Sequence, residues 1–125
     1  MGILTLLCSL FACNAQTEAE SFKSLSVEEY AKAIEDTTIV RLDVRTAEEY
    51  AEGHIEKTIN IDVLKNDFED KAVATLPKDK TIAVNCRSGK RSKNAARILV
   101  NRGFKVIELD AGYNDWVSKG MPIAK

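Results

Sequence analysis

The sequence predicts a single α/β domain with a mostly parallel central sheet flanked by helices. Segments rich in β-branched and apolar residues alternate with segments of helical periodicity, an order typical of parallel sheets with crossover helices. Two capping boxes, Ser26-Val27-Glu28-Glu29 and Thr46-Ala47-Glu48-Glu49, mark helix starts. The 125 residues are enough for one sheet covered by helices but not for two hydrophobic cores.

The expected elements follow in order from these patterns. The first capping box opens a helix at 26–35, and the second opens a short helix that ends near Gly53. Further helices are expected at 64–76, 91–101 and 112–118, and strands at 38–44, 58–61, 81–85 and 105–109. Open α/β sheets bind ligands at the carboxyl ends of their strands, so the residues after 38–44 and 81–85 are the first candidates for a site.

The charge distribution excludes some partners and points to another. The net charge of −1 argues against binding of nucleic acid or an anionic membrane by the whole molecule. Residues 81–107 nevertheless contain no acidic residue and seven basic ones: Arg87, Lys90, Arg91, Lys93, Arg97, Arg102 and Lys105. We interpret the later members as a solvated helix face and the first ones, which crowd around Cys86, as a candidate anion site.

The N-terminal segment is expected to lie outside the fold. Residues 3–12 form an apolar run that is too short to span a bilayer and fits the core of a secretory signal peptide. Leu10-Phe11-Ala12-Cys13 resembles a bacterial lipobox, in which Cys13 would be lipidated, whereas cleavage after Ala15 is the alternative. No Lys or Arg precedes the run, which counts against both forms of cleavage, and the alternative to export is a buried N-terminal strand or helix of a cytosolic protein.

These patterns give an expected organisation of the chain. Residues 1–15 are a signal peptide or lipoprotein signal, residues 16–24 a polar linker, and residues 25–122 the folded domain. The product would be exported to the bacterial cell envelope or periplasm, without a transmembrane span and with Cys13 as the lipid anchor in the lipoprotein form.

Cysteine and histidine counts restrict the chemistry. Cys86 is the only cysteine after residue 13, and His54 is the only histidine of the chain. The domain therefore has neither an internal disulfide framework nor the ligands for a structural zinc site, and we expect no metal. A single thiol left in such a domain is either a small buried hydrophobe or a reactive group.

The segment around Cys86 favours the reactive alternative. It reads Val84-Asn85-Cys86-Arg87-Ser88-Gly89-Lys90-Arg91-Ser92 and connects a predicted strand to a predicted helix. Backbone N–H groups at a helix start converge on one point, and Gly89 lets the loop curl by adopting a positive φ. Arg87, Lys90 and Arg91 add positive charge, so the loop favours a thiolate and would also hold an anionic substrate.

At these residues the sequence resembles the rhodanese family. Cys-Arg-Ser-Gly-Lys-Arg-Ser at 86–92 is similar to the active-site loop of that family. Asp43-Val44-Arg45 with 49–55 is similar to its upstream segment, and 95–99, 103–106 and 112–116 are similar to its downstream pattern. The resemblance extends over about 25–122. It departs at Glu56-Lys57-Thr58, where the family usually has small residues, often with Pro.

The resemblance implies a sulfurtransferase without cofactor, in which Cys86 accepts a sulfur atom as a persulfide. A small anionic donor such as thiosulfate would supply the sulfur, and a thiol or cyanide, including a protein thiol, would accept it. Arg87 and Arg91, with Lys90 close behind, are expected to bind the donor anion. The implied substrate-binding set comprises Arg87, Ser88, Gly89, Lys90, Arg91 and Ser92.

Four further residues have less direct expected roles. Asp43 is expected to brace a strand end or the cysteine loop, and Arg45 either pairs with a nearby carboxylate or helps to bind the anion. His54 invites comparison with a Cys–His dyad, although we favour a scaffold role. Trp116 is expected to pack in the core rather than line a pocket.

Two other functions compete with sulfur transfer. A cysteine phosphatase or arsenate reductase would use a similar loop, but the common phosphatase pattern places Arg after five intervening residues, whereas Arg91 follows Cys86 after four. A non-catalytic rhodanese-like module would bind a partner, although such modules generally lack the cysteine or its cations. The sequence leaves open the physiological donor, the acceptor, the oligomeric state and the fate of Cys13.

Overall fold

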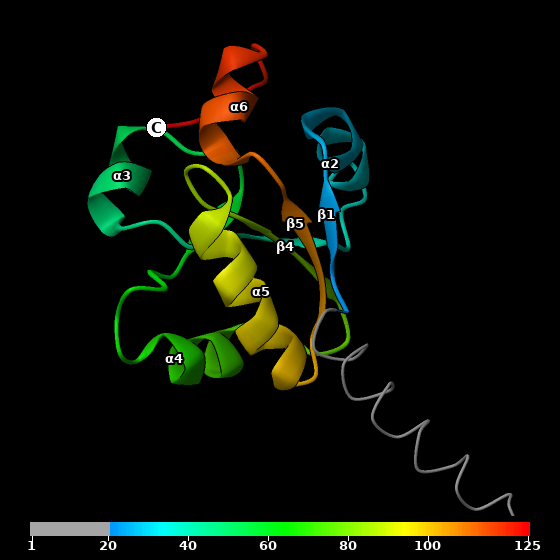
Figure 1. Ribbon diagram of the computed structural model, residues 1–125, viewed down its shortest axis with the longest axis vertical. Coiled ribbons are helices and arrows are strands. Elements are labelled where there is room, and N and C mark those ends of the chain that lie inside the picture. The colour runs from blue at the N-terminus through cyan, green and yellow to red at the C-terminus, as the bar shows by residue number, and fades with distance from the viewer. Residues whose placement is uncertain (1–20) are drawn as a thin grey trace, which may run out of the picture.

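In the computed structural model, which describes residues 21–125, five parallel strands form a central sheet (Figure 1). The strand order is β1-β5-β4-β2-β3, and every strand pair is parallel. The strands are β1 at Lys23–Leu25, β2 at Val40–Asp43, β3 at Thr58–Asn60, β4 at Thr81–Asn85 and β5 at Lys105–Leu109.

Four helices connect these strands and a fifth follows β5, and together they cover both faces of the sheet (Figure 1). They are α2 at Val27–Ala33, α3 at Ala47–Glu52, α4 at Phe68–Thr75, α5 at Lys90–Asn101 and α6 at Gly112–Ser118. Helices α4 and α5 share a buried cluster with one face of the sheet, and α2 and α6 share a second cluster with the other face. This arrangement confirms the predicted α/β class with a parallel sheet.

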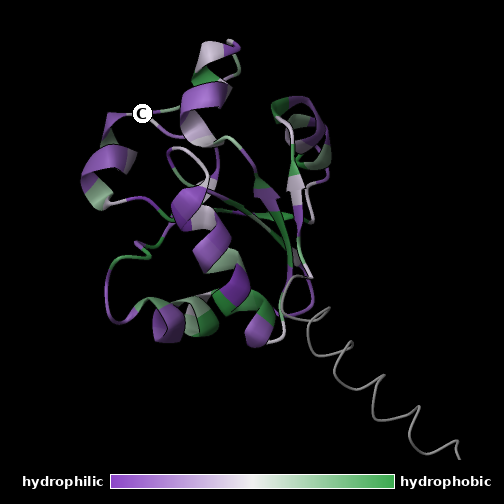
Figure 2. Cartoon of the chain, viewed as in Figure 1, coloured by the Kyte–Doolittle hydropathy of each residue, from purple (hydrophilic) through white to green (hydrophobic). Residues whose placement is uncertain are grey.

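The core consists of these two clusters, separated by the sheet. Leu42, Ile82 and Val84 point to the α4–α5 side, where Leu99 of α5 packs on them, whereas Ala83 faces the α2–α6 side. Successive side chains of a strand point to opposite faces, so a strand covered on both sides is apolar on both, as Ile82, Ala83 and Val84 of β4 are. Figure 2 shows hydrophobic residues on the central strands and hydrophilic residues along the outer surfaces of the helices.

Both predicted capping boxes form and fix the starts of their helices. Ser26 Oγ accepts the N–H of Glu29 at 3.1 Å, and the Glu29 carboxylate accepts the N–H of Ser26 at 3.0 Å. Thr46 and Glu49 make the same reciprocal pair at the start of α3. The predicted strands 81–85 and 105–109 and the predicted helix 112–118 coincide with β4, β5 and α6.

Two local predictions differ from the structure. Helix α4 begins at Phe68 rather than at residue 64, because the Asp62 side chain accepts the N–H of Leu64 at 2.9 Å and forms a turn that competes with the helix. Strand β1 was not predicted, because it has only three residues. It includes Lys23 and Ser24, so the last two residues of the predicted linker belong to the sheet.

The predicted signal segment 1–15, Cys13 and most of the linker lie outside the described residues. Between residues 21 and 125, no helix is both long enough and apolar enough to cross a membrane.

Candidate active site

The carboxyl ends of β2 and β4 lie side by side and bring the two sequence-predicted segments together. Asp43 at the end of β2 is the register partner of Asn85 at the end of β4, and Cys86 is the next residue. The side chain of Cys86 packs among the buried residues between the sheet and α4–α5 and is 1% exposed. The nucleophile expected from the sequence therefore lies at the edge where parallel sheets bind ligands.

Gly89 holds the loop around the sulfur atom. Its backbone N–H donates to Cys86 Sγ at 3.1 Å, and its φ of +104° lies in the left-handed region. A Cβ at this position would lie 1.9 Å from the carbonyl oxygen of Asp110, so only glycine fits. Among residues 21–125, Gly89 provides the one backbone N–H of the loop that donates directly to Cys86 Sγ.

The start of α6 supports the other side of the loop. The N–H groups of Tyr113 and Asn114 donate to the carbonyl oxygens of Cys86 and Arg87 at 2.8 and 3.0 Å. Gly112 makes this approach possible, because a Cβ there would lie 2.4 Å from the Arg87 carbonyl oxygen. The loop is thus fixed by hydrogen bonds to its backbone, which leaves the side chains of Arg87 and Ser88 exposed.

Ser92 lies in the first turn of α5, with its hydroxyl close to the sulfur. Gly89 is the N-cap of this helix, and Ser92 is its third residue. Ser92 Oγ lies 3.4 Å from Cys86 Sγ, 3.1 Å from the Gly89 carbonyl oxygen and 2.5 Å from Glu108 Oε2. The hydroxyl therefore connects the predicted nucleophile with a buried carboxylate.

Two of the three predicted anion-binding cations already have a carboxylate partner. Arg91 forms a bidentate pair with Glu49 at 2.8 and 3.0 Å, and Arg87 reaches the same carboxylate at 3.3 Å. Lys90 is exposed and makes no ion pair within the described part of the chain. Within residues 21–125, the loop therefore presents one cation without an acidic partner and two cations that share one.

Glu49 is a site residue that the sequence marked only as a capping residue. Its hydrogen bond from Arg91 is the main reason that the pKa of Glu49 falls to about 2, although partial burial works in the opposite direction. The same carboxylate raises the pKa of Arg91, to which the charge of Cys86 also contributes. The partners lie 38 and 42 residues apart in sequence, a separation that no local pattern shows.

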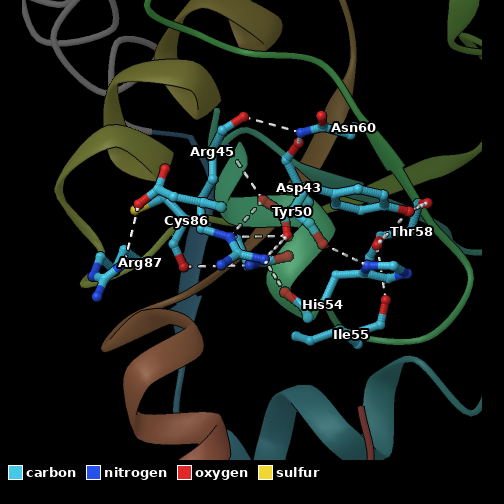
Figure 3. Close-up of polar contacts among 12 residues, drawn as sticks. Asp43, Arg45, Tyr50, His54, Ile55, Thr58, Asn60, Cys86 and Arg87 are labelled. Atoms are coloured by element: carbon cyan, nitrogen blue, oxygen red, sulfur yellow. Dashed lines mark hydrogen bonds and ion pairs between the residues drawn. The ribbon is translucent and has the colours of Figure 1, made fainter. Parts of the chain in front are cut away.

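Asp43 and Arg45 form a closed network next to the loop (Figure 3). The Arg45 guanidinium is 2% exposed, pairs with Asp43 at 2.8 Å and donates to the Gly53 carbonyl oxygen at 2.7 Å. Its Cζ atom lies 4.1 Å from the ring centroid of Tyr113. Arg45 is thus paired with a nearby carboxylate, the first of the two alternatives considered for it.

His54 and Trp116 are held by contacts of their own. The imidazole of His54 stacks on the Tyr50 ring at 3.8 Å between centroids, and its Nδ1 lies 2.9 Å from the Tyr50 carbonyl oxygen. Trp116 is 3% exposed, and its indole N–H donates to the Pro122 carbonyl oxygen at 2.8 Å. Both residues have structural partners, in line with the scaffold and packing roles favoured for them.

A second residue missed from the sequence is Glu108, which is fully buried at the end of β5. It accepts hydrogen bonds from Ser24 and Ser92 and pairs with Lys93 at 3.2 Å. The alternation along β5 places Glu108 on the same face as Val106, toward α5, and this is the one signal that the sequence carried. Between residues 21 and 125, no group of three or more His, Cys, Asp or Glu side chains could hold a metal ion.

Comparisons with known proteins agree with the observed fold. The sequence profile of the family described as Rhodanese-like domain matches residues 26–119. YtwF of Bacillus subtilis, whose name provisionally assigns it to the sulfurtransferases, is 36% identical over 101 residues, which cover 80% of this chain and 95% of YtwF. Thiosulfate sulfurtransferase GlpE of Shewanella oneidensis is 32% identical over 97 residues, which cover 77% of this chain and 93% of GlpE. The crystal structure of a rhodanese-related protein from Thermoplasma volcanium matches with a TM-score of 0.73 at 28% identity, over 82% of this chain and 97% of that one.

Proposed function

Because this chain belongs to the rhodanese-like domain family, in which similar proteins are named sulfurtransferases, we propose that it moves a sulfane sulfur through a persulfide on Cys86. The observation that carries the proposal is the position of Cys86 Sγ. The sulfur accepts the Gly89 N–H at 3.1 Å inside a loop that carries Arg87, Lys90 and Arg91. A thiolate in this position is stabilised by the N–H group and by the cations.

The first half-reaction loads the cysteine. The thiolate of Cys86 attacks the outer sulfur of a thiosulfate-like donor, and a new S–S bond forms. The old S–S bond of the donor breaks, and its electron pair leaves with sulfite. The products are the Cys86 persulfide anion and the sulfite dianion, so the charges balance.

The second half-reaction removes the sulfur atom from Cys86. A thiolate or cyanide attacks the outer sulfur of the persulfide, and the bond between the two sulfur atoms breaks with its electron pair on Cys86 Sγ. The enzyme returns to the starting thiolate, and donor and acceptor react in separate steps, which predicts ping-pong kinetics. A small thiol, cyanide or the cysteine of a protein fits this step equally.

Donor binding is assigned to the cations beside Cys86. Lys90 is the first contact for the anion, because it is exposed and has no acidic partner in residues 21–125. Arg91 and Arg87 bind the anion as it exchanges with Glu49. Preference for an anionic sulfur donor follows from this charge, whereas the choice of thiosulfate comes from the name of a relative.

The test is the mass of the intact chain. The reduced full-length protein is incubated with thiosulfate, with Cys86→Ser as the matched control, because that variant keeps Cys8 and Cys13. We expect the native chain to gain the mass of one sulfur atom, to lose it on addition of cyanide, and the variant to gain none. Absence of any gain while Cys86 is still alkylated would exclude thiosulfate as the donor. An equal gain in both proteins would exclude Cys86 as the carrier.

We also propose that the chain is exported to the bacterial envelope, as the apolar run at 3–12 and the lipobox-like Leu10-Phe11-Ala12-Cys13 suggest. Expression of the native chain and of Cys13→Ala with a labelled fatty acid separates the two forms of export. Label on the native chain alone supports a lipoprotein. Processed but unlabelled protein supports cleavage near Ala15, and unprocessed protein in the cytosol contradicts export.

A further inference from the structure

Glu108 is a buried carboxylate that the sulfur-transfer steps above leave without a role. Its side chain is fully buried, and each of its oxygens accepts a short hydrogen bond from a serine. Oε1 accepts from Ser24 Oγ of the register partner β1 at 2.5 Å, and Oε2 lies 2.5 Å from Ser92 Oγ of α5. Ser92 in turn lies 3.4 Å from Cys86 Sγ, so a single hydroxyl separates the carboxylate from the thiol.

Ser92 has a single hydroxyl proton, so it cannot donate to Glu108 and to Cys86 at the same time. A serine hydroxyl has one proton to donate and two lone pairs that accept. While Glu108 is ionised, its short contact draws that proton, because hydrogen bonds to a charged acceptor are the stronger ones. Ser92 Oγ then presents a lone pair to Cys86 Sγ. A thiol can donate its proton to that lone pair, whereas the negative charge of a thiolate repels it. Ser92 can donate to a thiolate only after Glu108 has acquired a proton of its own.

We propose that Ser92 and Glu108 form a proton relay for Cys86. The thiol proton passes from Sγ to Ser92 Oγ, the hydroxyl proton of Ser92 passes to Glu108 Oε2, and the electron pair of the S–H bond stays on Sγ. The step creates one thiolate and neutralises one carboxylate, so the net charge of the buried cluster is unchanged. Glu108 is a positioning residue, because it reaches the sulfur through Ser92. The inference rests on the proposed function, in which Cys86 is the nucleophile.

The relay also fits the return of the thiolate in the second half-reaction. When the persulfide bond breaks, the electron pair remains on Sγ, and Ser92 can donate to the new charge while the Glu108 carboxyl donates to Ser92. The Gly89 N–H, at 3.1 Å from Sγ, stabilises the same charge from the other side. Ser92 and Glu108 can thus form hydrogen bonds that suit Cys86 Sγ both as a thiol and as a thiolate.

Other titratable groups around the pair supply a fixed background. Lys93 of α5 lies 3.2 Å from Glu108 and 2.9 Å from Asp110, which follows β5. Burial lowers the pKa of Lys93, but the hydrogen bond that Lys93 donates to Asp110 and the charge of Glu108 outweigh it, so that Lys93 stays protonated. Tyr30 of α2 is buried with a raised pKa, mainly through burial, and Arg91 carries positive charge within reach of Cys86. None of these groups needs to change its charge when the proton moves.

The pH profile of Cys86 alkylation tests the relay. Two groups that share a proton titrate in two steps that belong to the pair. In the full-length native chain, the iodoacetamide rate at the Cys86 peptide, read by mass spectrometry, should rise with pH in two steps. The lower step marks the form with a thiolate and a protonated Glu108. Glu108→Gln keeps the shape and can still pair with both serines, with one of them now accepting from the amide NH2, but it cannot take up the thiol proton. It should show one step and react at least about tenfold more slowly at pH values between the two native steps.

Two further variants separate the relay from a structural role. Ser92→Ala breaks the link while Glu108 stays, so it should also show a single step, and it carries the test if Glu108→Gln does not fold. Ser24→Ala removes a contact to the same carboxylate at equal distance but none to Cys86, so both steps should remain, with the lower one at higher pH. A single step in the native chain, or two steps in either Glu108→Gln or Ser92→Ala, overturns the relay.

Failure of the relay and failure of sulfur transfer are distinguishable in the same samples. Alkylation measures the thiolate without any sulfur donor, whereas the mass gain with thiosulfate measures the persulfide. A persulfide with a single-step native profile overturns the relay alone. A two-step profile without a persulfide overturns the donor assignment alone.

Discussion

The loops that follow β2 and β4 begin at the same edge of the sheet, because the two strands are neighbours. They differ in the partners of their charged side chains. After β2, Asp43 and Arg45 neutralise each other in the interior, where the guanidinium is 2% exposed. After β4, the Arg87 side chain is 54% exposed, Lys90 points to solvent, and Glu49 is shared between two arginines. A charge with a complete set of buried partners supports the scaffold, whereas a charge with a shared or absent partner is available to a ligand.

The loop after β2 also supports the loop after β4. Tyr113 lies against the Arg45 guanidinium with its ring, and its backbone N–H donates to the carbonyl oxygen of Cys86. Changes in the first loop should therefore lower the stability of the fold, whereas changes in the second should alter sulfur transfer.

Asp43→Ala should lower the free energy of unfolding by about 3–5 kcal/mol, because it leaves the Arg45 charge buried without its partner. Urea denaturation of the two proteins measures the change. The matched control is Arg102→Ala, which breaks the exposed pair with Glu69 and should cost about 0–1 kcal/mol. Equal costs for the two variants would contradict the scaffold role of the β2 loop.

Gly89→Ala should reduce the rate of sulfur transfer by about 100-fold, because the new Cβ must push the loop away from the Asp110 carbonyl and misplace Sγ. Steady-state assays with thiosulfate and cyanide measure the rate. Gly120→Ala is the control, since Gly120 also has a positive φ of +72° but would place a Cβ in open space. It should leave the rate unchanged.

Glu49→Gln should lower the KM for thiosulfate by about fivefold at constant kcat, because Arg91 and Arg87 lose a competing carboxylate. Glutamine still completes the capping box of α3, so the helix start is preserved. Glu48→Gln on the same helix makes the same change of charge at an exposed position and should not alter KM. A raised KM in Glu49→Gln would instead assign Glu49 to holding the arginines in place for the donor.

The same variant tests the acid side of stability. The pKa of Glu49 is lowered from its ordinary value of 4.5 to about 2, so its charge stabilises the fold fully above pH 4.5 and progressively less as the pH falls through about 2. Unfolding free energies of the native chain and of Glu49→Gln, measured by urea denaturation, should therefore converge as the pH falls over that interval. A constant difference would show that Glu49 stays charged or is not paired in solution.

The smallest effect is expected for His54→Phe. The aromatic ring keeps the stacking on Tyr50 but loses the hydrogen bond to the Tyr50 carbonyl, which costs about 1 kcal/mol of stability. The pH profile of sulfur transfer should remain that of the native chain. Loss of an ionisation step in this variant would restore the Cys–His dyad as an explanation.

The comparison also explains which features the sequence could predict. Strand–helix alternation, the capping boxes at Ser26 and Thr46 and the loop around Cys86 are local patterns, and each depends on residues a few positions apart. They were sufficient for the α/β class and for the rhodanese resemblance, both of which are confirmed. The roles assigned to single loop residues stay predictions.

The features that the sequence did not reveal depend on distant pairing. Glu49 meets Arg91 because β2 and β4 are neighbours, and Glu108 meets Ser24 because β1 joins the sheet beside β5. Strand β1 itself is too short and too polar to stand out from a linker. Only the alternation along β5 hinted that Glu108 would point inward.

In the proposed donor binding, the anion would compete with the carboxylate of Glu49 for Arg91 and Arg87. An incoming dianion would replace a contact that already exists, and dissolved salt screens the resting pair as well as the new one. The affinity for the donor should therefore depend less steeply on ionic strength than the affinity of a site with three unpaired cations. The site would then keep similar occupancy in media of very different salinity.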